Sequence, residues 1–226
     1  MFLQRDSRNH LIYRKYQVCD FFDCLLNTVY LTKFIYYFVT GVLSVIFALI
    51  AMILIINWMG GKDRDETYLG GFNFNELIFN YHPVFMTTGM IVCGTCSMIS
   101  YRVIPLPKLI VKQFHAFMHT TAMVLIILGL ACVITGNNYK SKNEDNTYYG
   151  NLSTVHSLIG LTTCIIYALN YFLGFCHFLM PGFSVEARKA YMPNHVIIGV
   201  IALVAASCSA LTGDFRQLLI FNIHYN

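Results

Sequence analysis

Long apolar runs are the feature that most restricts what this chain can become. Five mainly hydrophobic stretches lie at roughly 34–58, 83–101, 112–136, 153–180 and 194–213, and about 18 or more such residues are enough to span a bilayer as a helix. Only 12% of the residues are charged, about half the fraction of a soluble domain. The pattern therefore predicts an all-α, polytopic transmembrane helix bundle whose first partner is the lipid bilayer.

Lysine and arginine are distributed unevenly between the segments that flank these spans. Alternate segments sum to ten on one side and five on the other, and the richer side is expected in the cytoplasm. We therefore predict a cytoplasmic tail at 1–33, a transmembrane domain at 34–213 with core helices at about 83–213, and a short tail at 214–226. The net charge of +4 is explained by these topology signals, and we expect no nucleic-acid partner.

Four histidines lie near the starts of the last four spans, at His82, His115, His156 and His195. Because successive spans enter from opposite faces, His82 and His156 are expected near the outer face, and His115 and His195 near the cytoplasmic face. Each pair belongs to alternate helices, which face each other across a four-helix core. Ionisable residues in spans are costly and usually functional. The sequence thus predicts two facing histidine pairs at matched depths.

Two neutral imidazoles on facing helices can hold one haem iron from both sides, with its potential tuned by burial and hydrogen bonds. Two pairs then predict two haem groups that carry electrons. Alternatives remain for the four residues. Each histidine alone could be interfacial, zinc would need about four ligands, and a proton path would need acidic residues that these spans lack beside the histidines. The competing function is a non-redox scaffold or transporter whose histidines serve packing or such a path.

Other residues receive less chemical interpretation. His119 lies one turn beyond His115 on the same helix face. It could line a haem pocket or donate a hydrogen bond there, but packing is the favoured role, and His177 is expected to have no functional role. Cys93 and Cys96 form a C-x-x-C motif, but a mid-span position without a cationic neighbour argues against a reactive thiolate. Asn151 begins a glycosylation sequon close to the membrane. Pro193 is expected to begin the last span, where its missing N–H is harmless.

The flanks of the four histidines resemble one known family. The matching segments are "FNYHPVFM" (79–86), "SYRVIP" (100–105), "KQFHAFMH" (112–119), "TVHSLIGL" (154–161) and "MPNHVIIG" (192–199). In this order and spacing they are similar to the cytochrome b561 family, in its animal ascorbate-dependent branch. The resemblance covers about residues 40–215.

This resemblance implies an integral multi-pass membrane protein of the plasma, lysosomal or secretory-vesicle membrane. Its four-helix core would hold two haem b groups, one on His82 and His156 and the other on His115 and His195. It implies electron transfer from cytoplasmic ascorbate to monodehydroascorbate or a ferric chelate on the far side. It also implies a possible homodimer and six spans, of which the sixth is missing here, either naturally or through an incomplete gene model.

Four basic residues match family positions around the cytoplasmic haem. In relatives these positions contact ascorbate, an anion at neutral pH that convergent cations would bind. The alternative is that they are topology anchors that meet lipid phosphates. The resemblance therefore implies a substrate site made by Lys112, Arg188, Lys108 and Arg102. No catalytic residue separate from the haems is expected.

Overall fold

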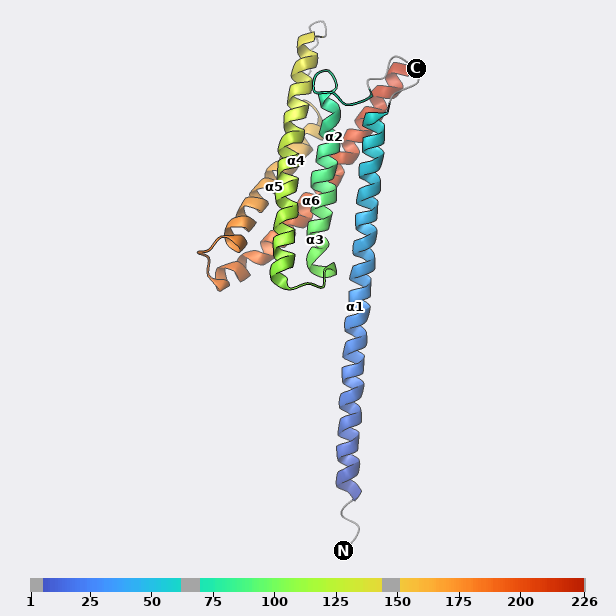
Figure 1. Cartoon of the computed structure of the whole chain (residues 1–226), viewed down its shortest axis with the longest axis vertical. Helices are drawn as coiled ribbons and strands as arrows, with labels where there is room; N and C mark the ends of the chain where they lie inside the picture. The colour runs from blue at the N-terminus through green and yellow to red at the C-terminus, as the bar shows by residue number, and fades with distance from the viewer. Residues whose placement is uncertain (1–5, 62–69, 144–150, 226) are drawn as a thin grey trace. The chain divides into compact units, whose positions relative to one another are not determined.

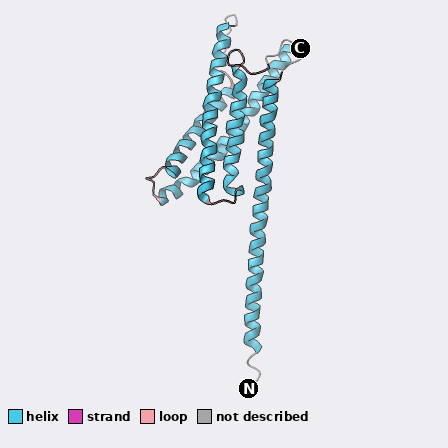
Figure 2. Ribbon diagram, viewed as in Figure 1, coloured by secondary structure: helices cyan, strands magenta, loops and turns pink. Residues whose placement is uncertain are grey.

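The chain is helical throughout the part that the structure describes (Figure 2). The computed structural model describes residues 6–61, 70–143 and 151–225, with side chains at 28–61, 70–142 and 151–215. Its elements are α1 (Asp6–Gly60), the 3₁₀ turn η1 (Ile78–Asn80), α2 (Tyr81–Met86), the π-helix η2 (Thr87–Cys93), α3 (Gly94–Val103), α4 (Lys108–Asn143), α5 (Val155–Gly174), the π-helix η3 (Phe175–Leu179) and α6 (Val185–Tyr225). The prediction of an all-α chain is confirmed.

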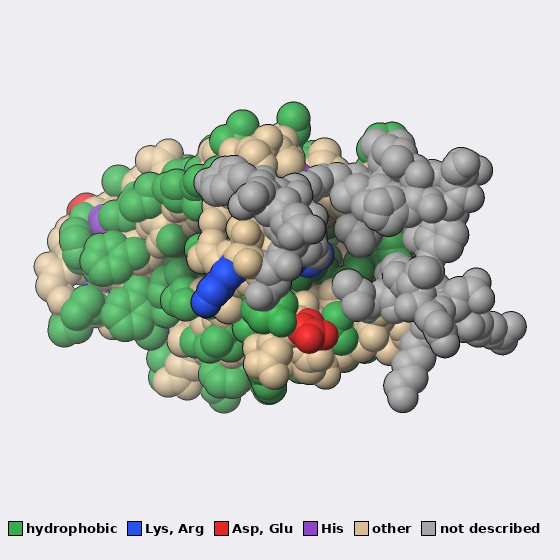
Figure 3. Space-filling view, turned by 90° about the horizontal axis from the view of Figure 1, so that it is seen from above, with side chains coloured by type: hydrophobic (Ala, Val, Ile, Leu, Met, Phe, Trp, Pro, Cys, Tyr) green, Lys and Arg blue, Asp and Glu red, His purple; other side chains and the backbone are tan. Residues whose placement is uncertain are grey.

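Five helical stretches are long and apolar enough to cross a membrane. They are Thr28–Gly60, Ile78–Val103, Lys108–Lys142, Val155–Leu179 and Val185–Phe215. Many large hydrophobic side chains are exposed on these helices, and hydrophobic groups cover much of the end view in Figure 3, with basic ones among them. Lipid tails are the solvent that suits such surfaces. The chain is an integral multi-pass membrane protein, as predicted.

The described residues divide into two compact units, Met1–Leu43 and Ser44–Asn226. Helix α1 runs through this division without interruption, and the last four spans all belong to the second unit. Helix α6 likewise continues past residue 213. The domain boundaries at 33/34 and 213/214 stay predictions.

The last helix begins well before its apolar run of 194–213. Helix α6 begins at Val185 because Ser184 caps it, with Ser184 Oγ accepting a hydrogen bond of 3.2 Å from the Ala187 N–H. Pro193 therefore lies inside α6. The prediction that Pro193 begins this span is wrong. A proline removes only its own N–H from the helix, and the serine cap upstream is the stronger start signal.

The core of the second unit is made of two packed helix pairs. Helix α4 packs along α2 and α3, α5 packs along α6, and α6 also contacts η2 (Figure 1). Between the pairs lies a buried cluster with members from four spans: Met90, Cys93, Ala122, Ile126, Cys164, Tyr167, Ala202 and Ala206. Three alanines in this cluster let the helices approach closely, as small residues do in membrane bundles. This packing brings the histidine-bearing helices together.

Both π-helical segments lie within spans that carry a predicted histidine. Segment η2 continues α2, which carries His82, and η3 continues α5, which carries His156. A π-turn widens the helix by one residue and often occurs at functional sites. At Gly89 in η2, an added Cβ would lie 3.1 Å from the carbonyl oxygen of Ala122 on α4. The widened turn is thus packed tightly against its neighbour.

Candidate functional site

His82 and His156 face each other from α2 and α5. Their ring centroids are 6.2 Å apart with an interplanar angle of 86°. His82 Nδ1 lies 2.9 Å from the carbonyl oxygen of Gly129, and His156 Nδ1 lies 2.8 Å from that of Ser209. A carbonyl can only accept, so each Nδ1 carries the proton and donates it. In the neutral ring each Nε2 is therefore unprotonated, and its lone pair is free to bind a metal.

His115 and His195 make the corresponding pair from α4 and α6. Their centroids are 6.3 Å apart with an interplanar angle of 65°. His115 Nδ1 lies 2.8 Å from Ser97 Oγ and 3.0 Å from the Ser97 carbonyl oxygen. Ser97 is fully buried, and its hydroxyl is also 3.0 Å from the His115 carbonyl oxygen. Helix α3 thus orients the His115 ring through one serine.

Two glycines make room for the imidazole rings. A Cβ added at Gly174 would lie 2.6 Å from His195 Cε1, and one added at Gly213 would lie 2.9 Å from His156 Cε1. Contacts under 3.0 Å require something to shift. Since protein interiors are close-packed, any larger residue at these positions would push the rings from their places.

The spacing of both pairs suits a metal held between two imidazoles. A metal–imidazole nitrogen bond is about 2 Å long, so two rings that share one metal have centroids roughly 6 Å apart. The observed separations of 6.2 and 6.3 Å match this value. Within 28–61, 70–142 and 151–215, three or more His, Cys, Asp or Glu side chains nowhere gather closely enough to hold a metal. The donor set present is one of facing pairs.

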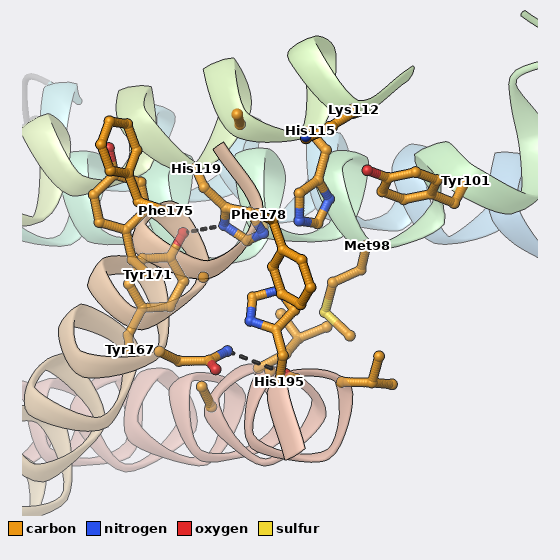
Figure 4. A pocket seen from close by; sticks show the side chains of 18 of the residues that line it. Met98, Tyr101, Lys112, His115, His119, Tyr167, Tyr171, Phe175, Phe178 and His195 are labelled. Atoms are coloured by element: carbon orange, nitrogen blue, oxygen red, sulfur yellow. Dashed lines mark hydrogen bonds between the residues drawn. The ribbon is translucent and has the colours of Figure 1, made fainter. Parts of the chain in front are cut away.

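A cavity of about 500 Å³ opens beside His115 and His195. Figure 4 shows the two rings pointing toward each other across it, with Met98 and Phe178 near them and Phe175 farther along the wall, beside Tyr171. Its volume lies in the range of about 300–1,000 Å³ that is typical of small-molecule and cofactor sites. The apolar and aromatic lining would exclude water from a planar group held between the rings.

Three of the four predicted cations reach this cavity. Arg102, Lys112 and Arg188 line it, and they come from α3, α4 and α6. The Arg188 Nε atom is buried without a hydrogen-bond partner in the structure. Lys108, at the first residue of α4, is exposed and is not among the lining residues. The structure therefore brings together three cations from three helices and leaves Lys108 outside.

Three further residues belong to the site. His119, for which packing was favoured over lining the pocket, does line the cavity and has its Nδ1 atom 2.5 Å from the Tyr167 hydroxyl oxygen (Figure 4). Asn170 also lines the cavity. The i, i+4 spacing of His115 and His119 places both on one helix face, but Tyr167 and Asn170 come from another helix. Only the packing of α5 against α4 and α6 reveals them.

The other residues discussed from the sequence, His177, Cys93, Cys96 and Asn151, make ordinary packing or surface contacts. His177 stacks on Phe183 and Tyr191, with centroid distances of 4.1 and 4.3 Å. Cys93 is buried, Cys96 is half-buried and both are free thiols. The Asn151 side chain is exposed and accepts a hydrogen bond of 2.9 Å from Asn137 Nδ2. None of these groups adds a donor to the two histidine pairs.

Comparison with known proteins agrees with this geometry. The family model described as eukaryotic cytochrome b561 matches residues 81–222, which include all four histidines. The chain belongs to the cytochrome b561 family. Membership in this family of b-type cytochromes implies that the chain binds haem b, and the paired imidazoles and the apolar cavity fit that group.

Curated relatives extend the match over most of the chain. Transmembrane ascorbate ferrireductase 1 of Arabidopsis thaliana is 32% identical over 181 residues, which cover 80% of this chain and 70% of the relative. A lysosomal membrane ascorbate-dependent ferrireductase of Homo sapiens is 34% identical over 74% of this chain and 66% of its own length. A plasma membrane ascorbate-dependent reductase of Xenopus laevis is 36% identical over 79% and 58%. The chain thus spans 58–70% of the length of these cytochrome b561 relatives.

Proposed function

We propose that this chain is a transmembrane ascorbate-dependent reductase. It would pass single electrons from ascorbate on the cytoplasmic side, through two haem b groups, to monodehydroascorbate or a ferric chelate on the other side. The observation that carries this proposal is the pair of facing imidazole sets, with centroid separations of 6.2 and 6.3 Å. The names of the relatives support the donor and the class of acceptor.

The four histidines would hold the cofactors. His82 and His156 would ligate one haem, and His115 and His195 the other, each through Nε2. Haem supplies the one-electron chemistry, while the protein supplies orientation and a dry path. The Nδ1–H bonds of His82, His115 and His156 keep these rings in the ligating tautomer. With two histidines to hold each haem, the groups would transfer electrons and would leave no place for oxygen to bind.

The cations at the cavity would bind the donor. Lys112 and Arg188 would contact the ascorbate anion, and Arg102 would add a third positive charge on the same cavity wall. A hydrogen bond to a charged group contributes about 1.5–3 kcal/mol. Lys108 lies one helical turn before Lys112 on α4. It would attract the anion through its charge without direct contact.

The direction of transfer follows from the charge distribution. The side richer in lysine and arginine is the side of residues 101–112 and 181–194, so the His115–His195 pair would be cytoplasmic and the His82–His156 pair outer.

We also propose that the chain forms a homodimer with a second copy of itself. Native mass spectrometry in detergent tests this oligomeric state.

The decisive experiment combines stoichiometry with sidedness. Purified protein should show the reduced α-band of b-type haem, two haems per chain, and reduction by ascorbate. In sealed vesicles loaded with ascorbate on the cytoplasmic face, an external ferric chelate should be reduced. A folded but colourless preparation would overturn the proposal and favour a scaffold or transporter. Reduction only from the opposite face would overturn the orientation.

A further inference from the structure

His195 differs from the other three paired histidines in the surroundings of its Nδ1 atom. The Nδ1 atoms of His82, His115 and His156 each have an oxygen partner within 3.0 Å. His195 Nδ1 is buried and has none. A buried polar group without a partner costs about 1–3 kcal/mol. A metal-ligating imidazole normally donates its other ring N–H to an acceptor. His195 Nδ1–H would therefore be a donor that still lacks an acceptor.

Asn170 offers the missing acceptor from α5. Its side chain is 8% exposed, and its Nδ2 donates to the His195 carbonyl oxygen at 3.2 Å. Because that carbonyl requires a donor, Nδ2 must be the atom facing it. The other amide atom, Asn170 Oδ1, is then fixed as an acceptor, and it is also buried without a partner. Asn170 Oδ1 and His195 Nδ1 are thus both buried and unpaired, and the hydrogen bond that joins the two residues runs from the Asn170 side chain to the His195 main chain.

One glycine allows the His195 ring to lie close to α5. A Cβ at Gly174 would lie 2.6 Å from His195 Cε1, whereas one at Gly199 on α6 would lie 3.5 Å from Asn170 Nδ2, in ordinary contact. Gly174 follows Asn170 by one turn on the same face of α5. The histidine ring therefore rests against one stretch of α5, with Gly174 leaving it space and Asn170 holding its main chain.

We propose that Asn170 is a positioning residue for His195, acting through both atoms of its amide. This inference rests on the proposed function, in which His195 ligates a haem iron through Nε2. On ligation the ring turns so that Nδ1–H donates to Asn170 Oδ1, while Asn170 Nδ2 keeps its bond to the His195 carbonyl. One side chain then sets both the position of α6 and the orientation of the ring.

The hydrogen bond would also affect the electronic character of the ligand. An acceptor on Nδ1–H makes the imidazole a stronger donor to iron, which favours the ferric over the ferrous state. Ser97 already gives His115 such a partner. Asn170 would do the same for His195, so that the two ligands of one haem are matched.

The test is a pair of substitutions that separate the two amide atoms. Asn170→Leu has similar volume and removes both, whereas Asn170→Asp keeps an acceptor but loses the donor. The measurement is the midpoint potential of the haem assigned to His115 and His195, with the ferric low-spin resonance as a second signature of ring orientation. Thr163→Val is the matched control, because Thr163 is buried on α5 and its hydroxyl bonds only the Ile159 carbonyl of its own helix, at 2.8 Å.

The expected result is a different response to the two substitutions. Asn170→Leu should raise the potential, with the ferric-to-ferrous preference weakened about tenfold, or ~59 mV for a one-electron couple. Asn170→Asp should leave it at or below the wild-type value, and Thr163→Val should leave it unchanged. The low-spin resonance should shift in the leucine variant.

Two outcomes would overturn the inference. Equal potentials in the leucine and aspartate variants would show that Asn170 acts only through Nδ2 on the α6 main chain. A haem unaffected by either substitution would show no role at all. Both leave the proposed function standing, since they presuppose a haem on His115 and His195. Wild-type protein without that haem would instead overturn the proposed function itself.

Discussion

The two histidine pairs have almost the same ring separation but are oriented by different parts of the protein. At the His82–His156 pair, both Nδ1 atoms donate to main-chain carbonyls, those of Gly129 and Ser209. At the His115–His195 pair, the near partners include the side chain of Ser97 and, as proposed, that of Asn170. The first pair is thus held by the helix backbones themselves, and the second is open to adjustment by substitution.

The two histidine pairs also differ in the cavity and the charged residues beside them. The His115–His195 pair borders a cavity of about 500 Å³ with three cations on its walls. Beside the His82–His156 pair, Asp214 lies within the last span and interacts electrostatically with His156. The sequence predicted no acidic residue beside the histidines in these spans, and that prediction is wrong at Asp214. A donor anion would be attracted to the cations beside His115 and His195. Under the proposed function, two pairs of the same geometry would serve a donor side and an acceptor side because different residues surround them.

The largest expected effect is loss of one haem at a time. His82→Ala or His156→Ala should remove the haem signal of the outer pair and retain most of the other. His115→Ala or His195→Ala should do the reverse, because each substitution removes one of the two imidazoles proposed to hold that haem. Spectra of the reduced variants provide the measurement. If His82→Ala and His115→Ala abolished the same component, the pairing across alternate spans would be wrong.

The next effect concerns the cations on the cavity wall beside the His115–His195 pair. Lys112→Ala or Arg188→Ala should weaken ascorbate affinity by one to two decades, as expected from a lost charge-assisted bond of about 1.5–3 kcal/mol. Lys108→Ala should have a smaller effect, since this residue lies outside the cavity. Stopped-flow reduction at varied ascorbate gives the affinity.

Dithionite is the control for these variants, because it needs no anion site. The haem spectrum and the dithionite rate should both stay at wild-type values. Unchanged ascorbate kinetics in a Lys112→Ala, Arg188→Ala double variant would assign both residues to topology alone.

A smaller effect is expected where a glycine makes room for a ring. In Gly174→Ala the new methyl would lie 2.6 Å from His195 Cε1, so the ring must move from its ligating position. We expect the affinity for the haem of this pair to fall about tenfold, measured as haem retained per chain after transfer to an excess of apo-acceptor. Thr163→Val is the control, since Thr163 is buried on the same helix as Gly174 and does not line the cavity. Equal retention in the two variants would contradict the packing argument.

The smallest effect tests the comparison directly with two serines. Ser97→Ala removes one of two partners of His115 Nδ1 and keeps the carbonyl at 3.0 Å, so it should shift the potential of that haem slightly. Ser209→Ala should leave the other haem unchanged, because His156 donates to the Ser209 main-chain carbonyl at 2.8 Å and the hydroxyl is 3.5 Å away. Redox titration of both variants is the measurement. A shift in Ser209→Ala as large as that in Ser97→Ala would remove the distinction between the pairs.

The spans and the histidine pairs could be predicted because both depend on local properties of the chain. Hydropathy accumulates along consecutive residues, and a bilayer admits few alternatives to a helix for such a run. The order of the spans then decides which histidines share a face, without knowledge of how the helices pack. Element ends were less predictable. The extent of α6 depends on the Ser184 cap, so Pro193 was a misleading boundary.

The sequence by itself determined the five apolar helices, which histidines pair with one another and the family. Tertiary structure decided that Nδ1 is the ring nitrogen with a hydrogen-bond partner in His82, His115 and His156. It also decided that Arg102, Lys112 and Arg188 line one cavity while Lys108 does not, and that Asn170 contacts His195. The physical reason is the distance in sequence over which the deciding interactions act. Helix formation and membrane insertion depend on neighbours along the chain, whereas hydrogen bonds and cavity walls depend on helix rotations and contacts between residues far apart in sequence.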